Sequence, residues 1–196
     1  MKIKELRKIP IFYRLDDDSL ENISQIVSTR VYNKGEVILL EEDTGNNLYL
    51  IKSGRVKVTR INSDGDEVIL TMLGEGEFFG EMAIFGGVTR SANVSALEKS
   101  EVLILTRQDF LSLLKKHPDI SIYLLEEMAS RLRKSDQLIK DLSLSNAEHK
   151  IAMSIVRLSE ELGKIKQGQV EIEDLQNKKD IANMAGTSRE TVSRTL

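Results

Sequence analysis

The chain has 196 residues, which is enough for two domains that each bury a core of their own. Its 28 basic and 31 acidic residues give a formal net charge of −3, so no global attraction to nucleic acid is expected. The absence of cysteine excludes disulfides, thiolate metal sites and cysteine nucleophiles, and no apolar run approaches the roughly 20 residues of a membrane helix. His117 and His149 are the two histidines, so we expect no metal or haem site. The N-terminal residues do not have the pattern of a signal peptide, so we expect a cytoplasmic location and no membrane partner.

The first half of the chain has the pattern of short helices followed by a β-structure. Residues 1–28 have helical periodicity, whereas short apolar or alternating runs at Leu48–Ile51, Val56–Thr59 and Glu67–Leu73 predict strands. Between the last two runs, Asp64-Gly65 is a strong hairpin signal. The frequent turn signals between 31 and 106 therefore predict a β-sandwich or β-roll with helices packed against it.

A glycine-rich loop in the segment FGEMAIFGGVTRSA, residues 79–92, combines the residue types that a sugar phosphate requires. Gly80 lets the backbone approach a ligand, Arg90 offers a planar fork to phosphate oxygens, and Ser91 adds a neutral hydrogen bond. Glu81 would repel a bare phosphate, so the ligand is expected to carry hydroxyl donors, as a ribose does. The alternative is an ordinary loop in which Arg90 pairs with Glu81. The motif favours a nucleotide site.

A helical pattern begins at Asp109, and Pro118 stands where the first turn of a long helix tolerates proline. Apolar residues then recur at alternating spacings of three and four, which is the a/d pattern of a coiled coil. The seam consists of Leu125, Met128, Leu132, Ser135, Ile139 and Leu142. We expect its apolar members to form a homodimer interface. The alternative is that this stripe packs on the β-structure.

The segment DIANMAGTSRETVSR, residues 180–194, has the pattern of two short helices around a glycine turn. Gly186 makes the turn and Val192 is expected to point into the core. Thr187 and Glu190 fit a capping box, with Ser188 as the competing N-cap. Residues 176–196 carry four basic side chains against two acidic ones, a weak bias typical of DNA-facing surfaces. The predicted DNA contacts are Thr187, Ser188, Arg189, Glu190, Ser193 and Arg194, the alternative being a solvated face.

These two motifs resemble those of a known family. Gly80-Glu81-Met82-Ala83, the pair Gly86-Gly87 and Arg90-Ser91-Ala92 are similar to the phosphate-binding cassette of cyclic-nucleotide-binding β-roll domains. Residues 180–194 resemble the helix-turn-helix of the Crp/Fnr bacterial transcription regulators. The resemblance covers almost the whole chain, and it is specific because both motifs occur in this order around a long helix.

The resemblance implies an α+β fold in three parts. These are a cyclic-nucleotide-binding β-roll, also called a double-stranded β-helix or jelly roll, at 1–116; a long dimerisation helix at 117–145; and a winged helix-turn-helix domain at 146–196, truncated before its wing. It implies phosphate and ribose contacts by Gly80, Glu81, Met82, Ala83, Arg90 and Ser91. It also implies base contacts by Leu70, Thr71, Leu73, Arg131, Ser135 and Asp136. Because Asp136 replaces the usual neutral side chain, the base preference stays open.

The resemblance further implies a regulator and not an enzyme. Its implied allosteric ligand is cyclic AMP, and its implied partners are a second copy of the chain, a palindromic double-stranded DNA operator and RNA polymerase. Arg189, Glu190 and Arg194 suit a TGTGA half-site, whereas Glu190, Ser193 and Arg194 suit TTGAT. Two alternatives are a ligand-independent family member controlled by its abundance and a nucleotide-sensing interaction subunit like those of kinases or channels.

Overall fold

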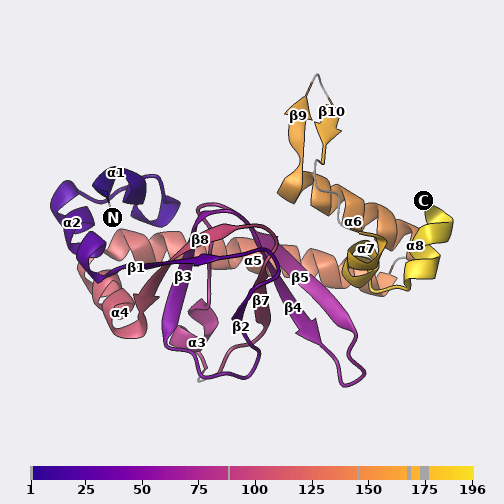
Figure 1. The fold of residues 1–196 in the computed structure, drawn as a ribbon, viewed down its shortest axis with the longest axis horizontal. Helices are drawn as coiled ribbons and strands as arrows, with labels where there is room; N and C mark the ends of the chain where they lie inside the picture. The colour runs from indigo at the N-terminus through magenta and orange to yellow at the C-terminus, as the bar shows by residue number, and fades with distance from the viewer. Residues whose placement is uncertain (1, 88, 145, 167–168, 173–176) are drawn as a thin grey trace. The chain divides into compact units, whose positions relative to one another are not determined.

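The computed structural model describes residues 2–87, 89–144, 146–166, 169–172 and 177–196, and Figure 1 shows the order of its elements. The chain forms two compact units. The first contains the residues up to Val58 together with Thr71–Ala129, and the second contains Thr59–Leu70 and Ser130–Leu196. Three elements run from one unit into the other, namely β4 (Val56–Ile61), β5 (Glu67–Leu73) and α5 (Pro118–Leu144).

The N-terminal segment folds into the predicted short helices. They are α1 (Ile3–Leu6), the 3₁₀ helix η1 (Pro10–Phe12) and α2 (Asp17–Ile26). The carboxylate of Asp16 caps α2 by accepting a hydrogen bond from the Ser19 N–H at 2.8 Å. The apolar side of these helices, which includes Leu6, Phe12 and Leu20, is fully buried.

Two four-stranded antiparallel sheets form a sandwich in the middle of the chain. One sheet has the order β1-β8-β3-β6, with β1 at Ser28–Tyr32, β8 at Ser100–Thr106, β3 at Asn47–Ser53 and β6 at Phe78–Phe79. The other has the order β2-β7-β4-β5, with β2 at Val37–Leu39 and β7 at Asn93–Ala96. Side chains of both sheets, such as Val102 and Val94, share one buried cluster. The predicted β-sandwich and its hairpin at Gly65, where φ is +85°, are confirmed.

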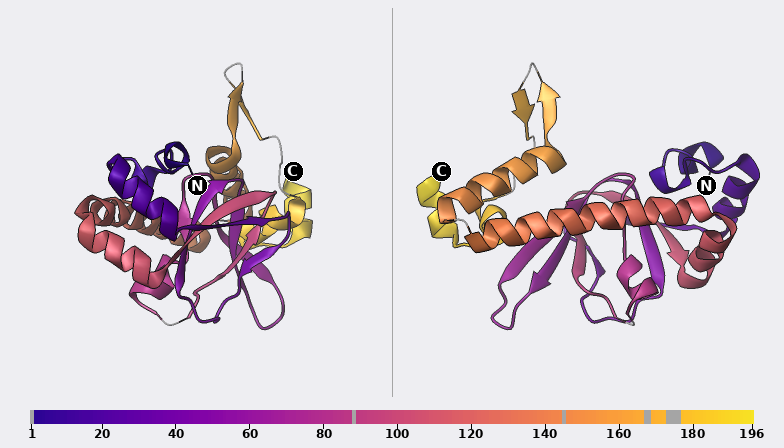
Figure 2. Two further views of the ribbon diagram at one scale, coloured as in Figure 1. Left: turned by 60° about the vertical axis from the view of Figure 1, so that its left-hand side comes forward. Right: turned by 180° about the vertical axis from the view of Figure 1, so that it is seen from behind.

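A second apolar cluster joins the N-terminal helices to one sheet and to the helices that follow it. The short helix α3 (Glu81–Phe85) lies between β6 and β7 in the sequence, and α4 (Arg107–Lys116) follows β8. Phe110 of α4 and Ile120 of α5 are buried in this cluster beside Leu50 and Leu103 of the sheet. Helix α5 begins at Pro118, as the sequence predicts, and Figure 2 shows it as one long continuous helix.

The C-terminal unit is built around three helices. These are α6 (Ala147–Leu162), α7 (Lys178–Ala185) and α8 (Arg189–Thr195), and a hairpin of β9 (Lys164–Lys166) and β10 (Gln169–Glu171) follows α6. Their core includes Ile151, Leu158, Ile181 and Val192, all almost fully buried. The inward direction predicted for Val192 is therefore right, whereas no sequence pattern predicted the hairpin. None of the helices in the described part of the chain combines the length and apolarity that crossing a bilayer requires.

Candidate functional site

The glycine-rich loop adopts a backbone conformation that only glycine accepts without strain. Gly80 has φ +84° and is the N-cap residue of α3. A Cβ placed on it would lie 2.7 Å from Arg90 Nη1 and 3.0 Å from the carbonyl oxygen of Asn47. The absence of a side chain therefore lets β6 turn into α3 while Arg90 and β3 stay close to the backbone.

Replacing Gly80 by alanine is expected to lower the free energy of unfolding by about 3 kcal/mol, because backbone strain and steric overlap add together. Gly65→Ala is a matched control, since Gly65 has φ +85° but a Cβ at this position would have no atom within 4 Å. We expect that control to cost only about 1 kcal/mol. Urea denaturation of both variants measures the difference, and equal losses would show that the close approach to Arg90 and Asn47 has no energetic role.

Arg90 is a buried cation that binds the backbone of its own domain. Arg90 is only 5% exposed. Its Nη1 donates a hydrogen bond to the carbonyl oxygen of Gly80 at 2.8 Å, and its Nη2 donates one to the carbonyl oxygen of Asn47 at 3.1 Å. The guanidinium carbon lies 5.5 Å from the ring centroid of Tyr49, which stacks on Phe79. Burial lowers the pKa of Arg90, while the neighbouring Tyr49 and other acidic groups oppose that shift. The side chain still carries its charge at neutral pH.

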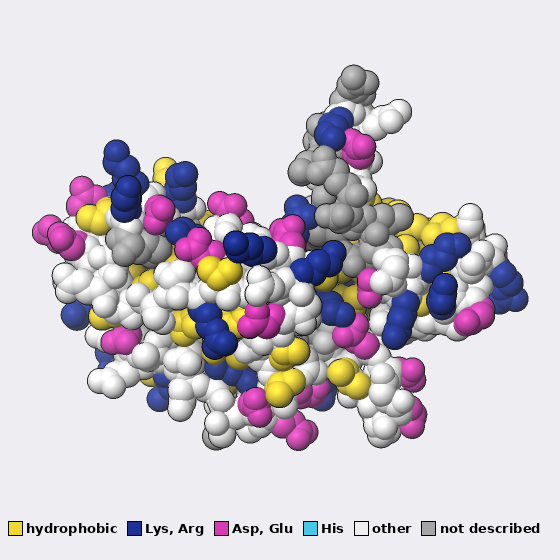
Figure 3. Space-filling view, viewed as in Figure 1, with side chains coloured by type: hydrophobic (Ala, Val, Ile, Leu, Met, Phe, Trp, Pro, Cys, Tyr) yellow, Lys and Arg dark blue, Asp and Glu magenta, His cyan; other side chains and the backbone are white. Residues whose placement is uncertain are grey.

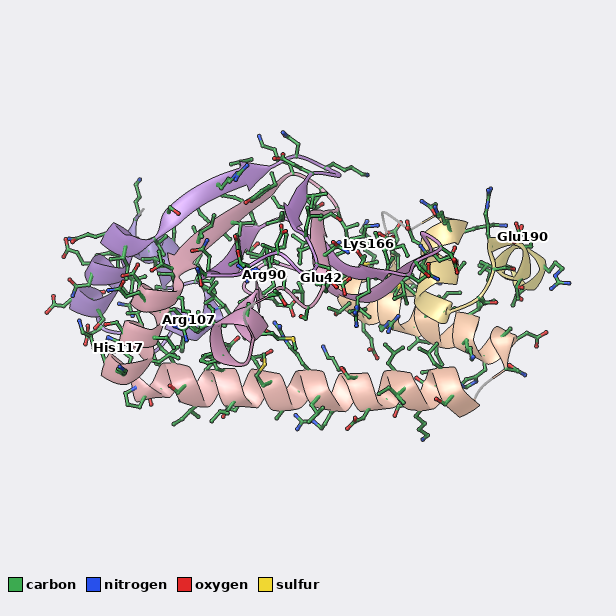
Figure 4. All side chains as sticks on the ribbon, turned by 90° about the horizontal axis from the view of Figure 1, so that it is seen from below. Glu42, Arg90, Arg107, His117, Lys166 and Glu190 are labelled. Atoms are coloured by element: carbon green, nitrogen blue, oxygen red, sulfur yellow. The ribbon has the colours of Figure 1, made fainter. Side chains whose placement is uncertain are left out.

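The backbone of Arg90 is held as firmly as its side chain. Its N–H donates to the carbonyl oxygen of Asp43 at 2.8 Å, and its own carbonyl accepts from the Glu42 N–H at 2.9 Å. Figure 4 labels Arg90 and Glu42 and shows them near each other. The loop from Leu40 to Thr44 therefore positions Arg90 and the adjacent Ser91 relative to α3.

A cavity of about 630 Å³ lies in the first unit beside the same loop. Its lining comprises Glu81, Met82, Phe85, Gly86, Gly87, Thr89, Ser91, Leu114, Ser121, Leu124, Leu125 and Met128. The walls are mainly apolar, and their polar side chains belong to Glu81, Thr89, Ser91 and Ser121. Glu81 is only 6% exposed, so a buried acidic residue forms part of the cavity wall.

The structure brings only some of the predicted ligand contacts to this cavity. Glu81, Met82 and Ser91 line the cavity. Gly80 and Arg90 do not line it, and the Arg90 guanidinium donates a hydrogen bond to the carbonyl oxygen of Gly80. Ala83 is buried in α3, Leu73 is buried in the sandwich core, and Thr71 of β5 is half-buried. The other residues predicted to contact the base, Leu70, Arg131, Ser135 and Asp136, belong to the second unit, in which Ser135 and Asp136 are exposed.

Sequence reasoning missed two groups of residues at this site. Asn47 and Tyr49, the partners of Arg90, lie about forty positions earlier on β3. Leu114 and Leu124, which form the cavity wall with Met128, come from α4 and α5. Their apolar character indicates burial, but nothing in the sequence shows that they face the loop.

The two C-terminal helices meet at a turn of the kind that the sequence predicts. Helix α7 ends at Gly186, which has φ +57°, and the Thr187 N–H donates to the carbonyl oxygen of Ala182 at 3.1 Å. The N-cap of α8 is Ser188, whose hydroxyl accepts from the Thr191 N–H at 3.2 Å. The capping box with Thr187 as N-cap is therefore wrong, because Ser188, whose backbone is extended (φ −84°, ψ 153°), is the residue that precedes and caps α8.

The outer side of α8 carries polar and charged groups. Val192 is buried, whereas the predicted DNA contacts Arg189, Glu190, Ser193 and Arg194 are exposed, as is Ser188; Thr187 is half-buried. Lys178 of α7 donates from Nζ to the Ser193 hydroxyl at 3.1 Å. Figure 3 shows Lys and Arg side chains gathered over the C-terminal helices, with fewer acidic ones. This surface can interact with an anionic partner.

No group of three or more histidine, aspartate or glutamate side chains able to hold a metal ion occurs among the residues that the structure describes.

The fold defines a class of transcription regulators that pair a ligand-binding domain with a DNA-binding domain. Its members combine a β-sandwich that carries a loop of this kind, a long helix and a C-terminal helix-turn-helix. Comparisons with known proteins specify the class. Residues 29–117 match the family model of the cyclic nucleotide-binding domain, and residues 149–196 match that of the Crp-like helix-turn-helix domain. The chain belongs to the Crp/Fnr family of transcription regulators.

Two curated relatives are similar over nearly the full chain. The cyclic AMP receptor protein of Thermus thermophilus is 35% identical over 187 residues, which cover 95% of this chain and 83% of the relative. The CRP-like cAMP-activated global transcriptional regulator of Mycobacterium tuberculosis is 27% identical over 191 residues, covering 97% and 85%. A cGMP-dependent protein kinase of Drosophila melanogaster is 31% identical over 144 residues, but they cover only 15% of the kinase. The full-length similarity is thus to regulators.

Solved structures support the same fold. The catabolite activator protein of Thermus thermophilus superposes with a TM-score of 0.61 at 35% identity, covering 95% of this chain and 84% of that one. The c-di-GMP responsive regulator CLP of Xanthomonas campestris superposes with a TM-score of 0.77 at 21% identity, covering 92% and 90%. The second likeness shows the fold alone. The predicted α+β architecture and family are confirmed.

Proposed function

We propose that this chain is a homodimeric, cytoplasmic transcription regulator whose binding to a palindromic DNA operator is controlled by cyclic AMP. The observation that carries the proposal is the convergence of Glu81 and Ser91 on one cavity, next to the buried cation of Arg90. A carboxylate, a hydroxyl and a guanidinium on one loop suit the ribose and the phosphate of a nucleotide.

In this proposal each group of the loop has a separate role. The Glu81 carboxylate accepts a hydrogen bond from the ribose hydroxyl, and the Ser91 hydroxyl donates to the cyclic phosphate. Backbone N–H groups of Met82 and Ala83 in the first turn of α3 add donors, since a first helical turn leaves such groups without helical partners. Arg90 contributes its charge, and it contacts the phosphate directly by exchanging one of its carbonyl partners for a phosphate oxygen. The names of the Thermus and Mycobacterium relatives favour cyclic AMP.

Isothermal titration with cyclic AMP tests the ligand, with cyclic GMP and cyclic di-GMP as competitors. Ser91→Ala is expected to weaken cyclic AMP binding about tenfold without changing the thermal unfolding midpoint, because Ser91 is exposed and its hydroxyl contacts only the weak acceptor sulfur of Met82 among the described side chains. Ser63→Ala, at an exposed position in the β4–β5 turn, is the control and should bind like the parent chain. Absence of heat with all three nucleotides, together with intact operator binding, would favour a ligand-independent regulator.

The long helix supports the homodimer in this proposal. Leu125, Leu132 and Ile139 recur every seven residues and are 69%, 63% and 62% exposed, and Ile122 on the same side is 50% exposed. Two other predicted interface residues are partly covered by their own chain. Met128 packs against the apolar cluster that contains Phe110 and Ile120, and Leu142 lies near Gly186. A stripe of exposed leucine and isoleucine costs free energy in water, and a second copy of α5 would cover it.

The C-terminal helices complete the proposed mechanism. The exposed side chains of α8 enter the major groove, where arginine suits guanine and glutamate suits the amino group of cytosine. Ligand binding shifts the population toward the state that fits the operator, so the nucleotide must bind that state more tightly than the other. RNA polymerase is the proposed further partner, since a regulator bound at a promoter acts on transcription through it.

A further inference from the structure

We propose that Lys178 and Ser193 act as a pair that selects the base at one position of each operator half-site. The inference rests on the DNA binding proposed above and adds to it a positioning residue outside the recognition helix. Lys178, the first residue of α7, makes Ser193 of α8 prefer a base with a carbonyl oxygen in the major groove, guanine or thymine, over adenine or cytosine.

The geometry that supports this pair is a contact between two packed helices. Lys178 Nζ lies 3.1 Å from Ser193 Oγ, and both residues are exposed. On the inner side of the same helices, Ile181, Ala182 and Val192 are almost fully buried. The buried contacts fix the spacing of α7 and α8, so the ammonium group stays within reach of the hydroxyl.

The chemistry of the contact determines which base edge the pair favours. An ammonium group only donates hydrogen bonds, so it occupies a lone pair of the Ser193 oxygen and leaves the hydroxyl proton available for another acceptor. A base approaching Ser193 meets this proton and a full positive charge. Guanine O6 and thymine O4 are acceptors, whereas the groups at the same place on adenine and cytosine, N6 and N4, carry donor hydrogens. Adenine N7 also accepts, as guanine N7 does, so the discrimination against adenine comes from its N6 amino group next to the ammonium. The pair therefore attracts the oxygen-bearing bases and repels the amino groups.

The neighbouring Lys179 distinguishes this proposal from simple attraction to phosphate. Lys179 is also exposed at the start of α7, and in the described part of the chain its ammonium makes no hydrogen bond to α8. A lysine that contacts only phosphate strengthens binding to all sequences alike and increases the salt dependence. Removing Lys178 or Lys179 removes the same charge, but only Lys178 contacts the side chain of Ser193.

The test is a binding selection from a randomised double-stranded DNA library with the full chain and cyclic AMP. The parent chain, Ser193→Ala, Lys178→Met, Lys179→Met and the Ser193→Ala/Lys178→Met double variant are compared. The parent is expected to prefer guanine or thymine about tenfold over adenine and cytosine at one half-site position. Ser193→Ala and Lys178→Met should each reduce that preference to about twofold or less at the same position, and the double variant should lose no more than either alone.

Lys179→Met should keep the base preference and lose affinity equally for all sequences. Circular dichroism of each variant confirms that the helices are retained. The proposal is overturned if Lys178→Met lowers the affinity for all DNA sequences equally, as Lys179→Met should. It is also overturned if Ser193→Ala leaves the base preference intact. If the parent chain enriches no sequence with or without cyclic AMP, the proposed function fails, and the role of the pair fails with it.

Discussion

Arg90→Ala is expected to lower the free energy of unfolding by about 3–5 kcal/mol and to abolish cyclic AMP binding. The side chain makes two charge-assisted hydrogen bonds, to the carbonyl groups of Gly80 and Asn47, and lies over the ring of Tyr49. Its removal leaves both carbonyls without that donor in a buried place and opens a space beside the loop. Urea denaturation measures the stability, and titration calorimetry measures the binding.

Arg107→Ala is the matched control for this experiment. Arg107 also donates to the loop region, from Nε to the carbonyl oxygen of Ile84 at 3.2 Å, but it is exposed and makes a single such bond. It should lose about 1 kcal/mol or less and keep nucleotide binding. Arg90→Lys, which retains the charge but loses the planar fork that reaches both carbonyls, should fall between the two. An Arg90→Ala variant as stable as the parent chain would contradict the structural role assigned to the guanidinium.

Leu132→Glu is expected to convert the proposed dimer to monomer. Leu132 is 63% exposed on α5, so the substitution leaves the core of a single chain intact. In a symmetric seam it removes two leucine side chains from the interface and places two like charges there, which should raise the dissociation constant about a thousandfold or more. Analytical ultracentrifugation measures the mass, and affinity for a palindromic operator should fall in parallel because each half-site then binds separately.

Lys134→Glu is the control for the dimer prediction. Lys134 is exposed on the same helix but lies off the apolar stripe, and its substitution also introduces a glutamate. This variant should remain dimeric at the concentration at which Leu132→Glu is monomeric. A dimer that survives Leu132→Glu would mean that α5 is not the interface, and the exposed Leu125, Leu132 and Ile139 would then need another partner.

Local sequence signals predicted many of the structural boundaries. Pro118 begins α5, Gly65 makes the β4–β5 turn, and Gly186 ends α7. Each signal depends on the backbone of one or two residues: proline lacks an N–H and suits a first turn, and glycine accepts a positive φ. The alternation of apolar residues similarly indicated strands, since it depends only on the two-residue period of an extended chain. Such features need no knowledge of distant contacts.

The choice of N-cap for α8 shows where local reasoning fails. Thr187 and Ser188 both suit the position, and Glu190 completes a capping box with Thr187. Ser188 caps the helix, and in the same structure Val192 is buried where α8 packs on α6 and α7. The two caps have similar intrinsic strength, so local preference by itself does not choose between them.

Residue types and their spacing were sufficient to predict the family, the order of the main elements and the presence of Glu81, Arg90 and Ser91 on one loop. The contacts of those side chains followed only from the packed fold. Arg90 turns toward the carbonyl groups of Gly80 and Asn47, and residues of α4 and α5 close the cavity beside Glu81 and Ser91. The reason is that a side chain's conformation and partners depend on packing between segments distant in the chain, whereas a residue's type and spacing record only its local preferences.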